Sequence, residues 1–306
     1  MISPDLSRRD FVTRVSLAGA ATALGSAALP VHAAAAEPRF KIIAFTKPFR
    51  TLNATQTAEL VADVGWDGVE LPVRTKDGQI TPEKVEDELP QFVEALRARQ
   101  REVAIITTDI TAVTPAAEKV LRTASRLGLK RYRLGFFNYA KDKPIPEQLN
   151  QVGAQLRELA ALNKDLGLQA GFQNHSGDSR VGAPIWDIWT MIKDLDPKAM
   201  GICFDIGHAT IEGGLAWPTH FRLAAPHLTA VFVKDFRWQK TGKDWKAAWC
   251  PLGEGMVNRD FFKRLQATNY TGPICQHHEY ELGENDAMRA HFKKDLATLR
   301  EWLKGV

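Results

Sequence analysis

Cysteine is scarce in this 306-residue chain, which contains three: Cys203, Cys250 and Cys275. So small and odd a number excludes a disulfide framework as the basis of the fold. Two of the three lie inside predicted strands, which favours small buried core residues over catalytic thiols.

A strong charge of one sign is also absent. The 40 Lys and Arg residues against 36 Asp and Glu give a formal net charge of +4, and no run of basic residues stands out. Proteins that bind nucleic acid normally carry a concentrated basic surface. We therefore expect no nucleic acid partner, and the 44% hydrophobic composition is that of an ordinary soluble domain.

No apolar run favours a membrane anchor. The best candidate, Val15–Val31, is rich in Ala and Gly, whereas a spanning helix needs about 20 strongly apolar residues. Arg8 and Arg9 precede it, and small residues at its end offer a cleavage site. This arrangement resembles a twin-arginine export signal. We predict a signal peptide at residues 1–36, a mature domain at 37–306, and a periplasmic or exported protein without a stable membrane anchor.

The chain also lacks a Gly-x-Gly-x-x-Gly turn after its first predicted strand, where Phe45-Thr46-Lys47-Pro48 stands instead. This absence disfavours a doubly wound dinucleotide-binding sheet. Strand patterns alternate with helical periodicities about 30 residues apart, as the eight βα units of a barrel do. No linker interrupts them, so we predict an α/β chain with a single (β/α)8 TIM barrel. The predicted strands are Phe40–Thr46, Gly68–Val73, Glu102–Thr108, Arg131–Phe137, Leu168–Gln173, Met200–Asp205, Leu228–Val233 and Gly272–His277.

Polar and ionisable residues directly follow the last four of these strands. In parallel α/β sheets, ligands bind at the carboxyl ends of the strands. Four consecutive strands that end this way predict one site built from several strands. Side chains alternate along a strand, so Gln173 and His175 point in one direction. The residues at these strand ends are Gln173, His175, Asp205, His208, Lys234, Asp235, His277 and Glu279.

Carboxylates and imidazoles in such a cluster make a mixed oxygen and nitrogen site, which suits Mn²⁺, Mg²⁺, Co²⁺ or Zn²⁺. An ion there polarises a substrate carbonyl and stabilises an enediolate. Taken one at a time these residues are more often structural, since a buried Asp caps helices and Lys234-Asp235 can form a salt-bridged strand end. Their shared position on one rim is what favours a site.

Six stretches together carry a resemblance to a known family. They are Gly65–Leu71, Arg133-Leu134-Gly135, Asp205-Ile206-Gly207-His208, Val233-Lys234-Asp235, Pro251–Gly255 and Gly272–Tyr280. With them, residues 40–303 resemble the sugar phosphate isomerase/epimerase family of xylose-isomerase-like TIM barrels. The resemblance implies an enzyme directed at carbohydrates. DNA repair of the endonuclease IV kind, found in the same superfamily, is disfavoured because the chain lacks its large His set and a basic groove.

The resemblance also implies a metal ion held by Glu on strand 5, Asp on strand 6, His on strand 7 and Glu on strand 8. Asp205 and Glu279 carry over directly. The strand 5 position is Gln173, whose amide oxygen can bind a metal, and the strand 7 position is Phe232, which cannot. We expect a divalent ion held by Gln173, Asp205, Glu279 and His208. The alternative is that water fills the fourth position and that His208 binds substrate. The next candidates for that imidazole are His175 and His277.

The expected reaction removes a proton next to a carbonyl while the ion holds the enediolate. Glu279 or a His is the expected base, and Lys234 stabilises the oxyanion. This interpretation assigns catalysis to Glu279, Lys234 and His208. Because Gln173 is an amide, it cannot be the second base of a two-base epimerisation. The residues predicted to bind a small carbohydrate substrate are Glu70, Arg133, His175, His277 and Trp238.

Two alternative functions stay open. An enzyme with one base can expel a leaving group after deprotonation, which makes it a lyase or dehydratase on a 3-keto-glycoside or related keto sugar. A chain that has lost two metal ligands can instead be an exported sugar-binding protein without catalysis. A homo-oligomer is compatible with each function.

One long segment between predicted elements, Phe236–Val257, contains Trp238, Trp245 and Trp249. On the ligand-binding face of a barrel, such a loop is predicted to be a lid whose indole rings stack on sugar. The alternative is that these Trp residues pack an oligomer interface or hold the loop down.

Overall fold

The computed structural model describes residues 39–304. The predicted signal peptide, residues 1–36, lies outside them. Within this described part of the chain, no helix combines the length and the apolar character needed to cross a membrane.

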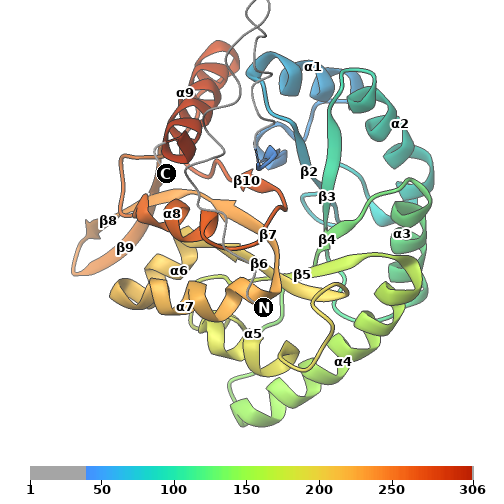
Figure 1. Ribbon diagram of the computed structural model, residues 1–306, viewed down its shortest axis with the longest axis vertical. Helices are drawn as coiled ribbons and strands as arrows, with labels where there is room; N and C mark the ends of the chain where they lie inside the picture. The colour runs from blue at the N-terminus through green and yellow to red at the C-terminus, as the bar shows by residue number, and fades with distance from the viewer. Residues whose placement is uncertain (1–38, 305–306) are drawn as a thin grey trace, which may run out of the picture. The chain divides into compact units, whose positions relative to one another are not determined.

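Eight parallel strands within residues 39–304 close into a barrel (Figure 1). The last of them, β10, pairs with β1 on one side and with β7 on the other, so the sheet has no open edge. The predicted TIM barrel is confirmed. The barrel strands are β1 (Ile42–Phe45), β2 (Gly68–Val73), β3 (Glu102–Thr108), β4 (Arg131–Arg133), β5 (Gln169–Gln173), β6 (Met200–Asp205), β7 (Leu228–Val233) and β10 (Ile274–Gln276).

Helices follow the strands along the chain and cover the outside of the barrel (Figure 1). Their apolar faces pack on the strands, and this contact zone forms the main hydrophobic core. The α-helices are α1 (Ala54–Val64), α2 (Val85–Arg97), α3 (Pro115–Arg126), α4 (Ile145–Leu166), α5 (Ile185–Ile192), α6 (Ile206–Gly213), α7 (Trp217–Ala224), α8 (Asp260–Gln266) and α9 (Asn285–Lys304). Short 3₁₀ turns lie at Lys47–Phe49, Pro82–Lys84, Gly214–Ala216 and Ala225–His227.

Local capping chemistry sets several helix boundaries. The Asn53 side chain accepts a hydrogen bond from the Gln56 backbone, and the Gln56 side chain accepts one from the Asn53 backbone, which starts α1 with a capping box. Gly65 and Gly167 end α1 and α4 with φ of 93° and 66°. That left-handed conformation favours glycine, so each helix ends at its glycine.

The segment predicted as a long loop is largely a β-hairpin. Strands β8 (Asp235–Thr241) and β9 (Asp244–Cys250) pair antiparallel, separately from the barrel sheet. Thr241 pairs with Asp244, which leaves Gly242 and Lys243 as a two-residue turn. Gly242 has a φ of 65°, and Gly at the first turn position is typical of a type II′ hairpin. The hairpin projects away from the barrel strands (Figure 1).

The fourth strand is shorter than predicted. The sequence suggests a strand to Phe137, but β4 ends at Arg133. After it, the backbone at Gly135 passes Asp109 so closely that a Cβ would lie 2.7 Å from the Asp109 carbonyl. Gly135 N donates to the Ile110 carbonyl at 2.8 Å, so the chain leaves the sheet at this point.

The interior of the barrel holds a second, smaller apolar cluster beneath the strand ends. Cys203 and Cys275 belong to it and are free thiols, which agrees with their prediction as core residues. Gly171 leaves the space that Cys203 fills, because a Cβ there would lie 2.2 Å from its sulfur. The members of this inner cluster are Ile43, Phe45, Ala104, Ile105, Cys203, Ala230, Phe232 and Cys275.

Candidate active site

Inward-facing side chains at the carboxyl ends of the strands form a chain of polar contacts. Arg133 Nε lies 3.2 Å from Glu70 Oε1, and Arg133 also donates to the side-chain oxygen of Gln173. The Gln173 amide in turn donates to Asp205 Oδ2 at 2.9 Å. Residues from β2, β4, β5 and β6 are thereby linked inside the barrel mouth.

The same chain continues through the last two barrel strands and closes on itself. Lys234 Nζ lies 3.3 Å from Asp205 Oδ2 and 3.0 Å from Glu279 Oε1. His277 lies between Glu279, with its Nδ1 3.9 Å from Oε1, and Glu70, with its Nε2 2.8 Å from Oε2. We call these seven residues the charged ring: Glu70, Arg133, Gln173, Asp205, Lys234, Glu279 and His277.

Most of the charged ring is buried, and Glu279 is its access point. The Lys234 side chain is 2% exposed and that of Asp205 is fully buried, whereas 23% of the Glu279 side chain is exposed. A cavity of about 480 Å³ opens beside Glu279. Lys47 and Trp249 also line it, so a ligand in this cavity meets the ring at Glu279.

Electrostatics keep two of the ring carboxylates, Glu279 and Glu70, ionised. Burial raises the pKa of Glu279, but Lys234 and His277 outweigh it and lower that pKa to about 2. Burial likewise raises the pKa of Glu70, and His277 and Arg133 bring it down to about 2. Nearby positive charge favours the charged form of an acid. Both acids are therefore anions at neutral pH.

His208 provides an unpartnered nitrogen next to the ring. Its Nδ1 lies 2.8 Å from Ser176 Oγ, while its buried Nε2 has no hydrogen-bond partner among residues 39–304 and lies 3.8 Å from Asp205 Oδ2. Burial, followed by the charge of Lys234, lowers the pKa of His208 well below its usual value. The imidazole of His208 is thus neutral, and it packs against that of His175 in a tilted arrangement with centroids 3.8 Å apart.

The local fold places His208 through Asp205. Asp205 ends β6 and caps α6, because its Oδ1 accepts the backbone N–H of His208 at 3.1 Å. Asn174 fixes the same strand end, since its side chain accepts from Asp205 N at 2.8 Å and donates to Asp205 O at 3.0 Å. Asp205 is therefore both a helix cap and a member of the ring.

The hairpin contributes Trp249, which sequence reasoning did not single out from its neighbours. The Lys234 ammonium lies 4.4 Å from the centroid of the Trp249 ring, and His208 packs edge-on against it at 5.3 Å. Trp238, the Trp predicted to bind substrate, is 43% exposed and packs against Phe236. It makes none of the ring contacts described above.

The structure brings most of the predicted site residues together. Glu70, Arg133 and His277 are members of the ring, and His175 contacts it through His208. Ser176 and Asn174 were missed, although both lie next to predicted site residues in the sequence. Their roles depend on which way a short loop turns, which strand periodicity does not indicate.

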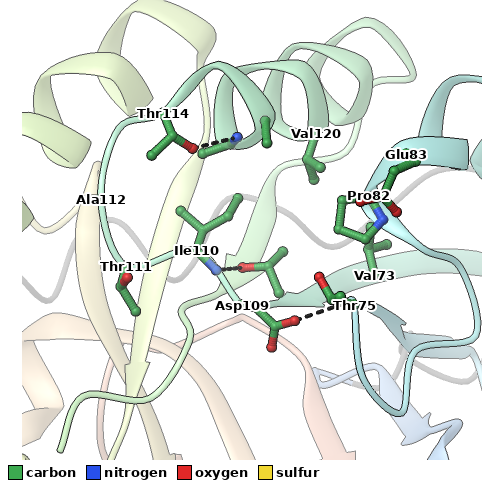
Figure 2. A pocket seen from close by; sticks show the side chains of 13 residues that line it. Val73, Thr75, Pro82, Glu83, Asp109, Ile110, Thr111, Ala112, Thr114 and Val120 are labelled. Atoms are coloured by element: carbon green, nitrogen blue, oxygen red, sulfur yellow. Dashed lines mark hydrogen bonds between the residues drawn. The ribbon is translucent and has the colours of Figure 1, made fainter.

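A second cavity of about 210 Å³ lies beside the ends of β2 and β3 and the start of α3 (Figure 2). Thr114 caps α3 there by accepting from Ala117 N at 3.1 Å, and Asp109 accepts from Thr75 N at 2.9 Å. No member of the charged ring lines this cavity. We therefore place the candidate active site at the ring.

The sequence profile of the xylose isomerase-like TIM barrel family matches residues 58–304, which is most of the chain. This protein belongs to that family. Among curated proteins, an uncharacterized protein of Methanocaldococcus jannaschii is 26% identical over 132 residues, 42% of this chain and 43% of that protein. The chain thus spans less than half of the curated relative that it matches.

Solved structures of other xylose isomerase-like barrels share the fold. A family protein from Mycobacterium smegmatis in complex with magnesium has 16% identity and a TM-score of 0.65, covering 87% of this chain and 97% of that one. A D-tagatose 3-epimerase-like protein has 20% identity and a TM-score of 0.65, with 87% and 98% covered. The 3-keto-D-glucoside 4-epimerase of E. coli has 17% identity and a TM-score of 0.66, with 86% and 99% covered.

The predicted metal ligands of this xylose isomerase-like barrel lie close together, but their donor atoms are engaged. The Lys234 ammonium lies between Asp205 and Glu279, where an ion that bridges both carboxylates would lie. The Gln173 oxygen accepts from Arg133, and Phe232 offers only an apolar ring. The buried His208 Nε2 has no hydrogen-bond partner among the described residues. This arrangement does not fit a divalent ion between the two carboxylates.

Another group of metal-type donors lies deeper in the barrel. Among the described residues, one ligand atom each of Glu70, Cys275 and His277 lie within 4.8 Å of one another. Both Glu70 oxygens already accept hydrogen bonds, and burial raises the pKa of the Cys275 thiol well above its usual value. A thiol binds metals as the thiolate, so this buried group is a hydrogen-bonded cluster.

Proposed function

We propose that this protein is an isomerase/epimerase-like enzyme that removes a proton next to a carbonyl on a carbohydrate. One observation carries the proposal: a neutral, unpartnered imidazole nitrogen and a buried ammonium flank the same carboxylate oxygen. His208 Nε2 and Lys234 Nζ lie 3.8 Å and 3.3 Å from Asp205 Oδ2. A base and a fixed positive charge that lie close together are what enolisation requires.

In this proposal His208 accepts the proton and Lys234 donates to the oxyanion. His208 is neutral at pH 7, so its Nε2 lone pair is available. The charge of Lys234 lowers the pKa of His208 in the free protein. As negative charge develops on the substrate oxygen, it offsets that positive charge and the basicity of His208 rises. The proton transfer and the stabilisation of the oxyanion therefore support each other.

Glu279 is proposed to hold Lys234 in place and to meet a substrate hydroxyl at the cavity. With a pKa of about 2, it is a weaker base than the reaction prefers, because a catalytic base works best with a pKa near the working pH. Of the two kinds of base that the sequence left open, the imidazole is favoured because His208 Nε2 has no partner among the described residues, whereas Glu279 is paired with Lys234. Glu279 is also the ring member that reaches the cavity.

A carbohydrate is proposed as the substrate for two reasons. Proteins of similar structure include a D-tagatose 3-epimerase-like protein, a 3-keto-D-glucoside 4-epimerase and an L-ribulose 3-epimerase. The cavity beside Glu279 combines charged side chains with the indole of Trp249, which suits a polar ring with an apolar face. The twin-arginine export signal stays a prediction from the sequence.

Solvent deuterium incorporation tests this function. The purified protein is incubated in D₂O with D-tagatose, D-allulose and a 3-keto-D-glucoside, and the sugars are read by NMR. We expect deuterium at one carbon next to the carbonyl and its loss in His208→Asn. His220→Asn, on α7 outside the ring contacts, is the control that keeps exchange. No exchange with any of these sugars would contradict the proposal, and saturable binding without exchange would favour the sugar-binding alternative.

A lyase or dehydratase is the second candidate, and the chemistry of Gln173 favours it over a two-base epimerase. An amide cannot act as the second base, and Gln173, like His208, lies beside Asp205 Oδ2. Elimination from the same 3-keto-D-glucoside gives an unsaturated sugar that absorbs in the ultraviolet. Growth of that absorbance, without an epimer in the NMR spectrum, identifies the lyase.

A further inference from the structure

We propose that Lys234 is an internal cation that replaces the divalent ion expected in this fold, so that the protein meets its substrate without a metal. The inference rests on the proposed function, since it names the positive charge that the substrate oxygen contacts. It describes a difference between this chain and the metal-binding pattern that the family resemblance implies.

The first support is the place of the Lys234 ammonium. It lies 3.0 Å from a Glu279 oxygen and 3.3 Å from an Asp205 oxygen, on a side chain that is 2% exposed. These carboxylates are the two predicted metal ligands that the sequence kept unchanged. A positive charge already occupies the point where both of them converge.

The second support is that the other two expected ligand positions, Phe232 and Gln173, offer no free donor atom. Phe232 presents an apolar ring that stacks on His277 with centroids 4.4 Å apart and lies 5.7 Å from the guanidinium of Arg133. The Gln173 oxygen accepts from the same guanidinium. Both positions therefore serve the packing of Arg133 inside the barrel. Neither offers a free anionic or imidazole ligand.

The third support is charge. The charged ring has three carboxylates, Glu70, Asp205 and Glu279, and these face Arg133, Lys234 and the imidazole of His277. Arg133 pairs with Glu70, and Lys234 is shared by the other two acids. A divalent ion at that point would have to displace a buried ammonium that has no other carboxylate partner among residues 39–304. Two cations competing for the same pair of anions repel each other strongly in a buried site.

The fourth support is that Lys234 retains one direction for a substrate. An ammonium has three N–H donors, and two carboxylates use two of them. The remaining direction faces the Trp249 ring at 4.4 Å. A carbonyl oxygen that takes the place of the indole face beside Lys234 replaces this weak contact by a charge-assisted hydrogen bond. The site thus supplies the electrophile from its own chain.

Binding of Mn²⁺ tests the inference without any assay of turnover. The free Mn²⁺ signal in electron paramagnetic resonance falls when the ion binds. We expect wild-type protein to bind no stoichiometric Mn²⁺ at millimolar concentration, and to keep its deuterium exchange in EDTA. Binding of one ion per chain by the wild type, lost in Asp205→Asn, would overturn the inference.

Lys234→Met provides the second arm, with Lys246→Met on the exposed part of the hairpin as the matched control. Removing the ammonium leaves two carboxylates without a cation, so Lys234→Met should bind Mn²⁺ at least about tenfold more tightly than wild type. Lys246→Met should match wild type. Unchanged or weaker binding in a folded Lys234→Met protein contradicts the inference. If that variant does not fold, the wild-type titration and a Lys234→Arg variant, expected to exclude Mn²⁺, still decide it.

The two proposals fail in different ways. If the wild type exchanges deuterium only after Mn²⁺ is added, the internal cation is wrong and the enzyme function stands. If no exchange occurs with any sugar, with or without Mn²⁺, the enzyme function fails. The Mn²⁺ titrations of wild type and Lys234→Met then still report whether Lys234 occupies the cation site.

Discussion

Glu279 differs from the other residues of the charged ring in reaching solvent, since 23% of its side chain is exposed. Its carboxylate holds the Lys234 ammonium from the cavity side, while Asp205 holds it from inside the barrel. A ligand that enters therefore meets Glu279, whose charge is needed to position Lys234. Small changes at this residue should affect activity more than stability.

Replacement of Glu279 by Gln is the prediction at this scale. The amide keeps the shape but loses the negative charge that holds Lys234, so we expect deuterium exchange to fall by about 100-fold or more. The midpoint of urea unfolding should change little, because Asp205 still pairs with Lys234. Glu281→Gln, an exposed neighbour, is the control. Full exchange in Glu279→Gln would remove Glu279 from the mechanism.

Single residues also mark what the sequence could and could not predict. The alternation of strand side chains placed Gln173, Asp205 and Glu279 on one rim, and the structure brings them together. The pairing of Lys234 with both Asp205 and Glu279 was not predictable in this way. Lys234 was expected to face a substrate oxyanion, but whether a long side chain lies between two acids depends on strand stagger around a closed barrel. Periodicity within one strand contains no such information.

At the scale of elements, the hairpin β8–β9 is tied to the barrel by one carboxylate. Asp235 accepts hydrogen bonds from the backbone N–H groups of Phe236, Gly253, Gly255 and Val257, at 2.9 to 3.0 Å. A Cβ at Gly255 would lie 2.3 Å from an Asp235 oxygen. The returning chain can therefore wrap around this carboxylate only with glycine at that position.

Replacement of Asp235 by Ala should release this closure. Four backbone N–H groups, two of them buried, lose a charged acceptor, so we expect the free energy of unfolding to fall by about 3 kcal/mol. Urea unfolding followed by circular dichroism measures the change. Asp244→Ala, at the exposed turn of the same hairpin, should shift the unfolding free energy by less than about 0.5 kcal/mol. Equal effects of the two substitutions would show that Asp235 does not hold the hairpin.

The hairpin also presents Trp249 to the site, and this gives a second prediction for the element. Trp249→Ala should raise KM and lower kcat, because Lys234 and His208 lose the ring against which they pack. Trp245→Ala removes an indole that is 62% exposed near the turn and should leave both constants unchanged. Steady-state kinetics on the sugar that shows exchange separates the two. Loss of activity in Trp245→Ala would favour a lid that closes through its tip.

The hairpin was the element that sequence reasoning placed least well. Thr241-Gly242-Lys243-Asp244 has the glycine that a two-residue turn needs, and this signal could have predicted the hairpin. Its strands, however, lack regular alternation: Ala247 and Ala248 follow one another, and Lys240 pairs with Trp245. The barrel strands were easier to predict because they are buried on both faces and therefore apolar throughout.

At the scale of the whole molecule, stability should depend on buried neutral imidazoles. Burial is the main cause that lowers the pKa of His278 to about 3 and that of His175 to about 4. It also lowers the pKa of His208 well below its usual value. Unfolded histidines titrate near 6.5. Between these values the unfolded chain binds more protons than the folded one, so stability decreases as the pH falls below about 6.5.

We expect the unfolding free energy to decrease by roughly 3 kcal/mol between pH 7 and pH 5. Asp295 acts in the opposite sense, since burial raises its pKa to about 6 and its contribution to stability increases on acidification. It is one group against the three histidines. Urea unfolding at several pH values measures the slope. His278→Phe, which keeps the packing against Trp66 and Phe292, should flatten it. A slope of opposite sign would contradict neutral buried imidazoles.

The contact between Lys234 and Trp249 has a consequence for spectroscopy. A charge 4.4 Å from an indole ring influences the energy of its excited state, so the emission of Trp249 depends on where that ammonium lies. The chain contains eight Trp residues, and the difference between wild type and Trp249→Phe isolates this signal. An oxygen that draws Lys234 away from the ring should then shift the emission on binding. The protein thus contains its own fluorescent reporter of site occupancy, which can screen sugars before any product is known.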